Sequence, residues 1–250
     1  MLKVNNVAVF YEDKKALDNI SFSVGKGEWL MLLGANGAGK TSLIKTLCRE
    51  LSYKGEITLL NKDIRKYKNK AYARSLGVLS QLHNNNTALN VKEVVSLGRY
   101  SYTGVFAPFS DQDTYYIDQA IETVGLKGYE NRPMYTLSGG EQQRAYLAQV
   151  FAQNPKVLLL DEPVNSLDLY YTVSLLNAVK TWLKQGERCV ISAMHDVGLA
   201  AKYGEKCLLL KEGQVSLYGD CQEVLFSKEI NEAYKLDVRK TMREQAEFWL

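Results

Sequence analysis

Short apolar runs with strand-like composition crowd the first third of this 250-residue chain. Runs rich in Val, Ile, Leu and Phe that are bounded by turn residues are typical of β-strands. We therefore predict a strand-rich N-terminal portion, part of it an attached antiparallel sheet. The predicted strands are LKVNNVAVF (2–10), NISFSV (19–24), EWLMLLG (28–34), GEITLL (55–60) and SLGVLSQ (75–81).

The middle of the chain has a different, helical spacing. In DTYYIDQAIETVG (113–125) the apolar residues stand at 117, 120, 121 and 124, which places them on one face of a helix. Asp113 is the predicted N-cap, and Gly125 is the predicted stop signal.

Strands and helices then alternate to the C-terminal end, and this alternation indicates a parallel α/β core. VLLL (157–160) is wholly apolar, as a strand buried on both faces should be. The remaining predicted elements are a helix at 171–185 ending at Gly186, a strand CVISAM (189–194), a helix DVGLAAKY (196–203), a hairpin at 207–219 and an amphipathic helix SKEINEAYKL (227–236).

Composition narrows the class of protein. A hydrophobic content of 46% and a charged content of 24% are ordinary for a globular protein. The net charge of +3 is too small to indicate nucleic-acid binding, and the basic run KDIRKYKNK (62–70) is expected to be a solvated surface. None of the four cysteines forms a C-x-x-C pair, so we expect buried free thiols and a reducing compartment.

Nothing in the chain resembles a segment that enters a membrane. The N-terminus, MLKVNNVAVFYEDKK, lacks the apolar core of a signal peptide. No stretch approaches the ~20 apolar residues of a spanning helix. We expect no direct membrane insertion, so that any membrane role requires a partner.

A glycine-rich loop separates the apolar run EWLMLLG from a predicted helix. Gly34, Gly39, Lys40 and Thr41 fit the P-loop pattern G-x-x-x-x-G-K-[ST]. Glycines let backbone N–H groups curl around phosphate oxygens, and the helix N-terminus adds partial positive charge. Lys40 would reach the β- and γ-phosphates, and the Thr41 hydroxyl would ligate Mg²⁺. The predicted ATP site comprises Gly34, Ala35, Asn36, Gly37, Ala38, Gly39, Lys40, Thr41 and Ser42.

Polar residues follow three of the predicted strands. Ligands of open α/β sheets bind at the carboxyl ends of strands. Asp161, after VLLL, is therefore placed to hold Mg²⁺, and Glu162 is placed to polarise the water that attacks the γ-phosphate. His195 could point at the γ-phosphate, and Gln81 could ligate Mg²⁺ or a water. Taken alone, solvated carboxylates, a structural histidine and a plain strand-end glutamine remain the alternatives.

A second glycine-rich helix start, LSGGEQQR, lies at 137–144. Ser138 and Glu141 form an S-x-x-E capping box, and Gly139 and Gly140 leave the backbone bare at the helix N-terminus. This is a second anion site, although a capped helix without a ligand is the alternative. Because the first loop already serves one nucleotide, the second site is explained if it faces the ATP of another copy. We therefore predict a homodimer that encloses two ATP molecules.

Taken in order, these segments resemble the ATP-binding subunit of ABC transporters over essentially the whole chain. The family implies a P-loop NTPase (RecA-like) core with an antiparallel β subdomain and an inserted α-helical subdomain. We place the core at 1–81 and 155–250 and the helical subdomain at 82–154. The resemblance rests on the P-loop at 34–41, the Q-loop glutamine Gln81, the signature LSGGEQQR, the LLLDEP box at 158–163, NSLD (165–168) as a D-loop ending at Asp168, and the switch histidine His195.

The resemblance also implies partners and a reaction. Tyr11 resembles the aromatic residue that stacks on adenine, with an ordinary exposed or core tyrosine as the alternative. EVVSLGRYSYTGVF (93–106) is similar to the subgroup that serves importers of iron–siderophore complexes, haem or cobalamin. The implied protein hydrolyses ATP as a homodimer on the cytoplasmic face of the membrane. Its implied partners are a permease dimer and a substrate-binding protein.

Some residues depart from the family, and rival classes exist. Val164 and Asn165 replace the usual Thr and small residue, and Asn84, Asn85 and Asn86 follow Gln81. The runner-up is a soluble ABC-type ATPase of iron–sulfur cluster assembly, which the GRYSYTG stretch opposes. A nucleic-acid or ribosome-acting ABC protein would carry coiled-coil or zinc insertions or a second cassette. A non-catalytic nucleotide-binding module is opposed by intact Glu162 and His195.

Overall fold

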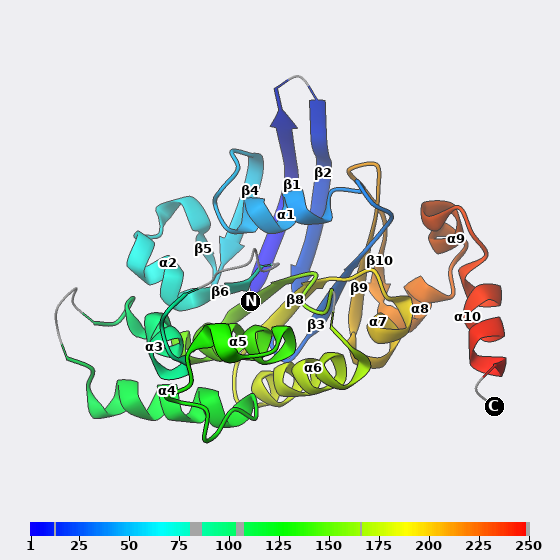
Figure 1. Ribbon diagram of the computed structural model, residues 1–250. Helices are drawn as coiled ribbons and strands as arrows, with labels where there is room; N and C mark the ends of the chain where they lie inside the picture. The colour runs from blue at the N-terminus through cyan, green and yellow to red at the C-terminus, as the bar shows by residue number, and fades with distance from the viewer. Residues whose placement is uncertain (13, 81–86, 104–107, 166, 249–250) are drawn as a thin grey trace. The chain divides into compact units, whose positions relative to one another are not determined.

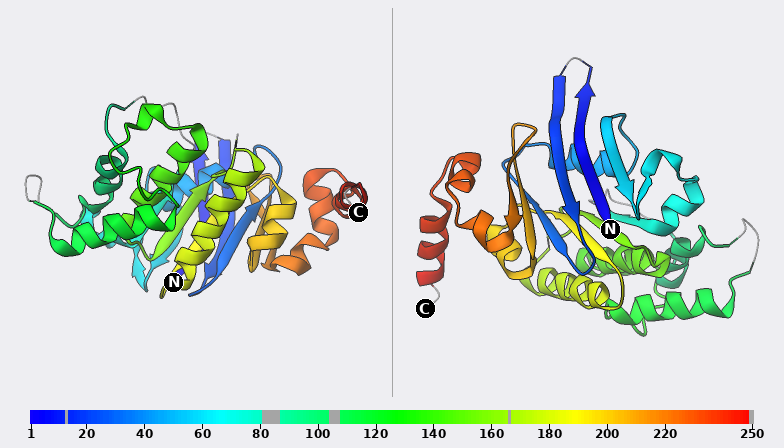
Figure 2. Two further views of the ribbon diagram at one scale, coloured as in Figure 1. Left: turned by 60° about the horizontal axis from the view of Figure 1, so that its bottom comes forward. Right: turned by 180° about the vertical axis from the view of Figure 1, so that it is seen from behind.

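The computed structural model describes residues 1–12, 14–80, 87–103, 108–165 and 167–248 (Figures 1 and 2). The chain forms two compact units, one of residues 1–66 with 189–250 and the other of residues 67–188. These bounds differ from the predicted limits at 82 and 154. The second unit is larger than the predicted helical subdomain because it also holds two strands, the helix before the first of them and the helix after the second.

The first unit contains an antiparallel sheet with the strand order β2-β1-β4-β5 (Figure 1). Its strands are β1 (Leu2–Tyr11), β2 (Lys14–Val24), β4 (Lys54–Leu59) and β5 (Lys62–Asp63). Leu2, Val4, Val7 and Val9 of β1 are fully buried, so one face of the sheet packs on the core.

A second set of strands in the same unit has β3 (Trp29–Leu33) at its centre. β3 pairs in parallel with β8 (Cys189–Ala193) and with β9 (Lys206–Lys211). β10 (Gln214–Asp220) pairs antiparallel with β9. Every residue of β3 and β8 is buried, as expected for parallel strands covered on both faces.

Helices complete the first unit. They are α1 (Lys40–Leu47), α7 (Val197–Tyr203), α8 (Cys221–Leu225), α9 (Lys228–Tyr234) and α10 (Val238–Glu247), with a 3₁₀ turn η1 at Ile64–Lys66. α9 and α10 lie side by side at the C-terminal end (Figure 2). The sequence analysis did not predict α10, which has a single buried residue, Val238.

The second unit contains a parallel strand pair and most of the longer helices. β6 (Leu76–Leu79) pairs in parallel with β7 (Val157–Asp161). The helix α5 (Gly139–Gln153) packs against its neighbours α3, α4 and α6. The helices of this unit are α2 (Asn69–Ser75), α3 (Val91–Ser96), α4 (Asp111–Thr123), α5 and α6 (Leu169–Lys184), with 3₁₀ turns η2 (Leu97–Arg99) and η3 (Met134–Thr136).

The predicted α/β class is confirmed, with parallel strands in both units and an antiparallel portion in the first. The predicted N-cap of α4 is wrong. The helix begins at Asp111, and Ser110 is its cap because the Ser110 hydroxyl accepts from the Asp113 N–H while the Asp113 carboxylate accepts from the Ser110 N–H. Asp113 is therefore the third residue of a capping box.

The cysteine prediction is confirmed, since all four thiols are free and three of them are buried. Burial raises the pKa of the Cys189 thiol to about 12. Among the described residues, no helix combines the length and the apolar character that a bilayer crossing requires.

Candidate functional site

The backbone of the loop at 34–39 can be formed only with glycine at two positions. Gly34 has a φ of 141°, and a Cβ there would lie 2.3 Å from the carbonyl oxygen of Leu210. Gly39 has a φ of 107°, and a Cβ there would lie 2.8 Å from Leu17 Cδ2. Both values fall in the region that side chains rarely adopt. The fold itself therefore requires these glycines.

Lys40 begins α1 and is held by the loop that precedes it. Its side chain is only 5% exposed, and Nζ donates to the carbonyl oxygens of Gly34 (2.6 Å) and Ala35 (3.2 Å). These bonds offset the cost of burying an ammonium group. Gly39 is the N-cap of α1 and supplies no side-chain cap to the first-turn N–H groups. A buried cation beside an N-terminus that lacks a side-chain cap suits a phosphate chain.

The strand pairing brings His195 to the same sheet edge as this loop. Leu32 of β3 pairs with Ala193 of β8, and the Met194 N–H donates to the Leu32 carbonyl at 3.2 Å. β3 and β8 are therefore neighbouring parallel strands, with Gly34 after the carboxyl end of β3 and His195 after the carboxyl end of β8. His195 is exposed.

Tyr11 is the last residue of β1 and pairs with Lys14, the first residue of β2. Leu17 lies three residues further along β2, and its side chain occupies the space that a Cβ on Gly39 would enter. The hairpin thus brings Tyr11 to the neighbourhood of the loop. Its side chain is 44% exposed and available for stacking on a planar ligand.

In the second unit, the two predicted acidic residues follow β7. Asp161 and Glu162 are both half-buried, and Glu162 has a φ of 51°. The side-chain amide of Asn165 donates to the Glu162 carboxylate. Asn165, which departs from the family within the predicted D-loop, therefore contacts the predicted catalytic carboxylate. Gln81, which follows β6, and residue 166 lie outside the described residues.

The capping box at the start of α5 is confirmed. The Ser138 hydroxyl accepts from the Glu141 N–H at 3.3 Å, and the Glu141 carboxylate accepts from the Ser138 N–H at 2.8 Å. The bond from the Ser138 backbone N–H lowers the pKa of Glu141 and keeps it ionised. Ser138 and Gly139 are exposed, whereas Gly140 is buried.

Two further residues of LSGGEQQR hold α5 in place, and the sequence analysis gave them no role. The buried Gln143 side chain donates to the Pro163 carbonyl at 3.1 Å, one residue after Glu162. The buried Arg144 side chain donates to the Val124 carbonyl at 3.0 Å, at the end of α4. Both are polar residues on the inner face of a predicted helix. A polar residue at such a position is the sequence signal that could have identified their anchoring role.

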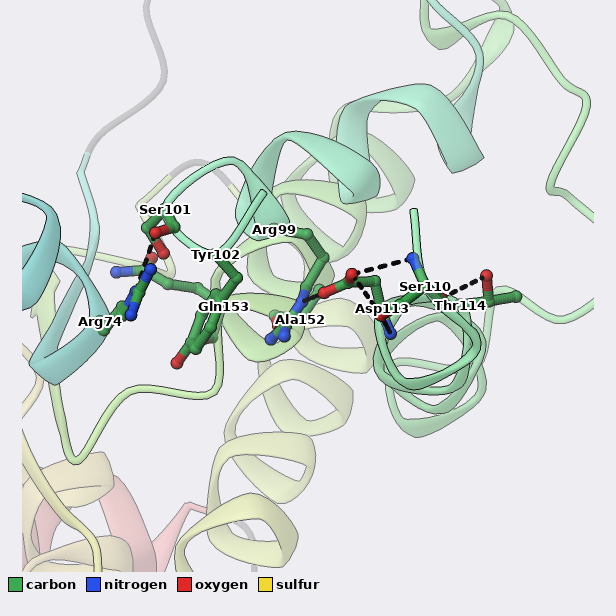
Figure 3. A network of polar contacts seen from close by, with 9 residues as sticks. All are labelled: Arg74, Arg99, Ser101, Tyr102, Ser110, Asp113, Thr114, Ala152 and Gln153. Carbon is green, nitrogen blue, oxygen red and sulfur yellow. Dashed lines mark hydrogen bonds and ion pairs between the residues drawn. The ribbon is translucent and has the colours of Figure 1, made fainter. Parts of the chain in front are cut away.

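The other end of α5 is held by Arg99 (Figure 3). Its guanidinium donates to Asp113 (2.8 Å) and to the Ala152 carbonyl (2.8 Å), and it contacts the rings of Tyr102 and Tyr116. Both members of the ion pair are buried. Arg99 belongs to the GRYSY stretch of the subgroup resemblance, and the structure shows that it anchors that stretch to the signature helix.

Asp168, predicted to face a nucleotide, is the N-cap of α6. Its carboxylate accepts from the Tyr171 N–H at 2.9 Å. The first unit thus brings the P-loop, Tyr11 and His195 together. The second unit holds Asp161, Glu162, the signature segment at 138–140 and Asp168. The chemical roles of all these residues stay predictions.

Comparison with known proteins identifies what this arrangement is similar to. The ABC transporter family model matches residues 17–165. The ABC transporter ATP-binding protein YvrA of Bacillus subtilis is 34% identical over 98% of this chain, which spans 56% of that protein. The petrobactin import ATP-binding protein FatE of Bacillus anthracis is 33% identical over 94% of both chains.

A solved structure described as a metal-chelate type ABC transporter in an inward-facing conformation superposes with a TM-score of 0.81. It is 25% identical and covers 94% of this chain and 88% of its own. This likeness confirms the predicted ABC ATPase fold.

Proposed function

Because the chain belongs to the ABC transporter family, whose ATP-binding subunits bind and hydrolyse ATP, we propose that it energises an importer. The proposed cargo class is iron–siderophore complexes, haem or cobalamin. The proposed assembly is a homodimer of this chain bound to a permease dimer and supplied by a substrate-binding protein. The proposed location is the cytoplasmic face of the inner or plasma membrane.

The P-loop carries the ATP part of the proposal. Lys40 is buried, donates to two carbonyls of its own loop, and stands at an N-terminus without a side-chain cap. A triphosphate would replace those neutral carbonyls with anionic oxygens. Both partners of each bond would then be charged, which adds direct charge attraction to the bond from the ammonium group.

The cargo class is supported by the relatives. FatE is named for petrobactin import, and the matching solved structure is described as a metal-chelate type transporter. The alternative, a soluble ATPase of iron–sulfur cluster assembly, is not favoured by these relatives.

The proposed chemistry divides among the residues at the strand ends. Thr41 offers a hydroxyl and Asp161 a carboxylate, which are the oxygen ligands that Mg²⁺ prefers, so each is a proposed ligand of this ion. Gln81 is a further proposed ligand. When bound, Mg²⁺ would neutralise the charge on the phosphates. Glu162 would accept a proton from the attacking water, and His195 would donate a hydrogen bond to the γ-phosphate.

The homodimer is supported by the start of α5. Ser138 and Gly139 are exposed, and the first turn of this 15-residue helix presents its N–H groups beside a bare backbone. In the proposed dimer, Ser138, Gly139 and Asp168 face the ATP bound by the other copy. Binding of ATP would close the dimer, and hydrolysis would release it.

A native pull-down tests the proposal. The Glu162→Gln variant is tagged and extracted from membranes of its own cells with mild detergent and ATP. We expect a polytopic membrane protein to co-purify, and the Lys40→Ala variant, whose ATP affinity should be reduced, serves as the control. Recovery of soluble cluster-assembly proteins alone would contradict the importer and favour the alternative.

A further inference from the structure

The two glycines of the signature segment occupy different environments. Both lie in the first turn of α5, and neither has a positive φ, so the backbone conformation requires glycine at neither position. A Cβ on Gly139 would meet no atom of the described residues within 4 Å. A Cβ on Gly140 would lie 2.4 Å from Cγ, 2.6 Å from Cδ2 and 2.9 Å from Cδ1 of Tyr171. Gly140 is glycine because a ring occupies its side-chain space.

The same ring has further contacts that fix its place. The Tyr171 backbone N–H donates to the Asp168 carboxylate at 2.9 Å, which fixes the first turn of α6 from which the ring projects. The Arg144 guanidinium carbon lies 5.2 Å from the ring centroid, within the range of a cation–π contact. Arg144 in turn donates to the Val124 carbonyl at the end of α4. The ring of α6 therefore packs against the start of α5, and Arg144 links this contact to the end of α4.

We propose that Tyr171 is a positioning residue for the signature segment. Its ring supports Gly140 from behind and sets the position of the Ser138 and Gly139 backbone relative to Asp168. Both Asp168 and the signature segment are proposed to face the second nucleotide. The ring would therefore fix the positions of Asp168 and the signature segment relative to each other. This inference rests on the proposed function.

A ring that only filled space would affect stability alone. A positioning ring also affects turnover, because a displacement of about 1 Å in a catalytic group can cost up to 10²-fold in rate. ATP affinity of the single chain should stay unchanged, because the P-loop lies in the other unit of the chain.

The test is a double-mutant cycle with Gly140→Ala and Tyr171→Ala, in which Tm, ATP affinity and kcat are measured for each variant. Gly140→Ala alone should lower Tm by about 2–10 °C, because it overpacks the site beneath the ring. In the Tyr171→Ala background the same change should raise Tm by about 1–4 °C, because alanine then favours the helix without a clash. Such a reversal of sign is the signature of direct coupling.

The kinetic arm separates positioning from packing. Tyr171→Ala should lower kcat on the order of 10- to 100-fold with unchanged ATP affinity. Tyr171→Phe, which keeps the ring, should retain wild-type kcat. Gly140→Ala should regain part of its lost kcat when Tyr171→Ala is added.

Two results would overturn the role of Tyr171. One is an equal effect of Gly140→Ala on Tm in both backgrounds, since a contact other than the Tyr171 ring would then limit the space at Gly140. The other is a wild-type kcat in Tyr171→Ala. A wild-type chain that fails to hydrolyse ATP would instead contradict the proposed function, and the Tm cycle would still decide whether the ring and Gly140 are coupled.

Discussion

The P-loop and the signature segment are both glycine-rich helix starts, but they are built in different ways. Gly34 and Gly39 have positive φ values and are enclosed by residues 16–17 and by Leu210. The cradle is therefore formed by backbone, and contacts within the chain fix its shape. The signature helix starts with ordinary backbone conformations, and side chains from other segments hold it.

This difference teaches what each segment can do by itself. A backbone cradle with a buried lysine can bind a phosphate chain as a single copy. The signature segment has one glycine beneath Tyr171 and one, Gly139, whose open side meets none of the described residues within 4 Å. In the proposed homodimer, this exposed face would meet the nucleotide of the second copy.

The largest predicted effect separates binding from hydrolysis. Glu162 stands in the same unit as the signature helix, one residue before the carbonyl to which Gln143 donates. Glu162→Gln should lower kcat by about 10²–10⁴-fold, as expected for loss of a general base. ATP affinity, measured by fluorescent-nucleotide titration, should stay unchanged. Normal turnover would show that another group is the base.

The next effect tests whether remote side chains hold the signature helix. Arg99→Ala would leave the buried Asp113 carboxylate without its cation and free the far end of α5. Breaking a buried pair costs about 3–5 kcal/mol, so calorimetry should show Tm falling by about 6–20 °C. Lys127→Ala removes the exposed pair with Glu122 and is the matched control, with an expected cost below about 1 kcal/mol. Similar shifts in both variants would contradict the comparison.

Lys40→Ala tests the P-loop. Loss of a charged hydrogen-bond donor is worth about 1.5–3 kcal/mol, so ATP affinity should fall about 10- to 150-fold. Because the rest of the cradle is backbone, the variant should remain folded with an unchanged circular dichroism spectrum. Retained ATP affinity would remove Lys40 from the site.

Adding one methyl group has a smaller effect on the free energy of unfolding, and its sign is opposite in the P-loop and the signature segment. Gly34→Ala should destabilise the chain by about 1–3 kcal/mol, because φ is 141° and the Leu210 carbonyl occupies the space. Gly139→Ala should be neutral or stabilise α5 by about 0.5–1 kcal/mol, because its φ is not positive and its side-chain space is open. Both variants should lose ATPase activity. Thermal melts that shift in the same direction would contradict the comparison.

The smallest effect is a pH dependence that belongs to the second unit. Burial raises the pKa of Asp113, but bonds from the Ser110 hydroxyl and the Arg99 guanidinium outweigh it and leave that pKa below its ordinary value. Asp113 therefore stabilises the fold above the pKa of the unfolded carboxyl, about 3.9, and loses this contribution as pH falls through the folded value. Denaturant midpoints between pH 5 and about pH 3 should fall less steeply in Asp113→Asn than in the wild-type chain.

Local segments of the sequence were sufficient to predict the P-loop, the capping box at Ser138 and the individual buried strands. Each of these depends on residues within about ten positions of one another, such as Gly34 and Lys40. The α/β class followed for the same reason, since the strand and helix periodicities are local.

The sequence also determined which residues carry the predicted chemistry, because a phosphate cradle and a carboxylate at a strand end need fixed residue types. Only the tertiary structure decided what holds them in place. Three side-chain contacts hold these residues: Tyr171 against Gly140, Arg99 at the end of α5, and Asn165 with Glu162. The first two join segments that are distant in the sequence. Packing selects such contacts by shape and by the need to satisfy buried polar groups, and neither property has a period or a motif in the chain.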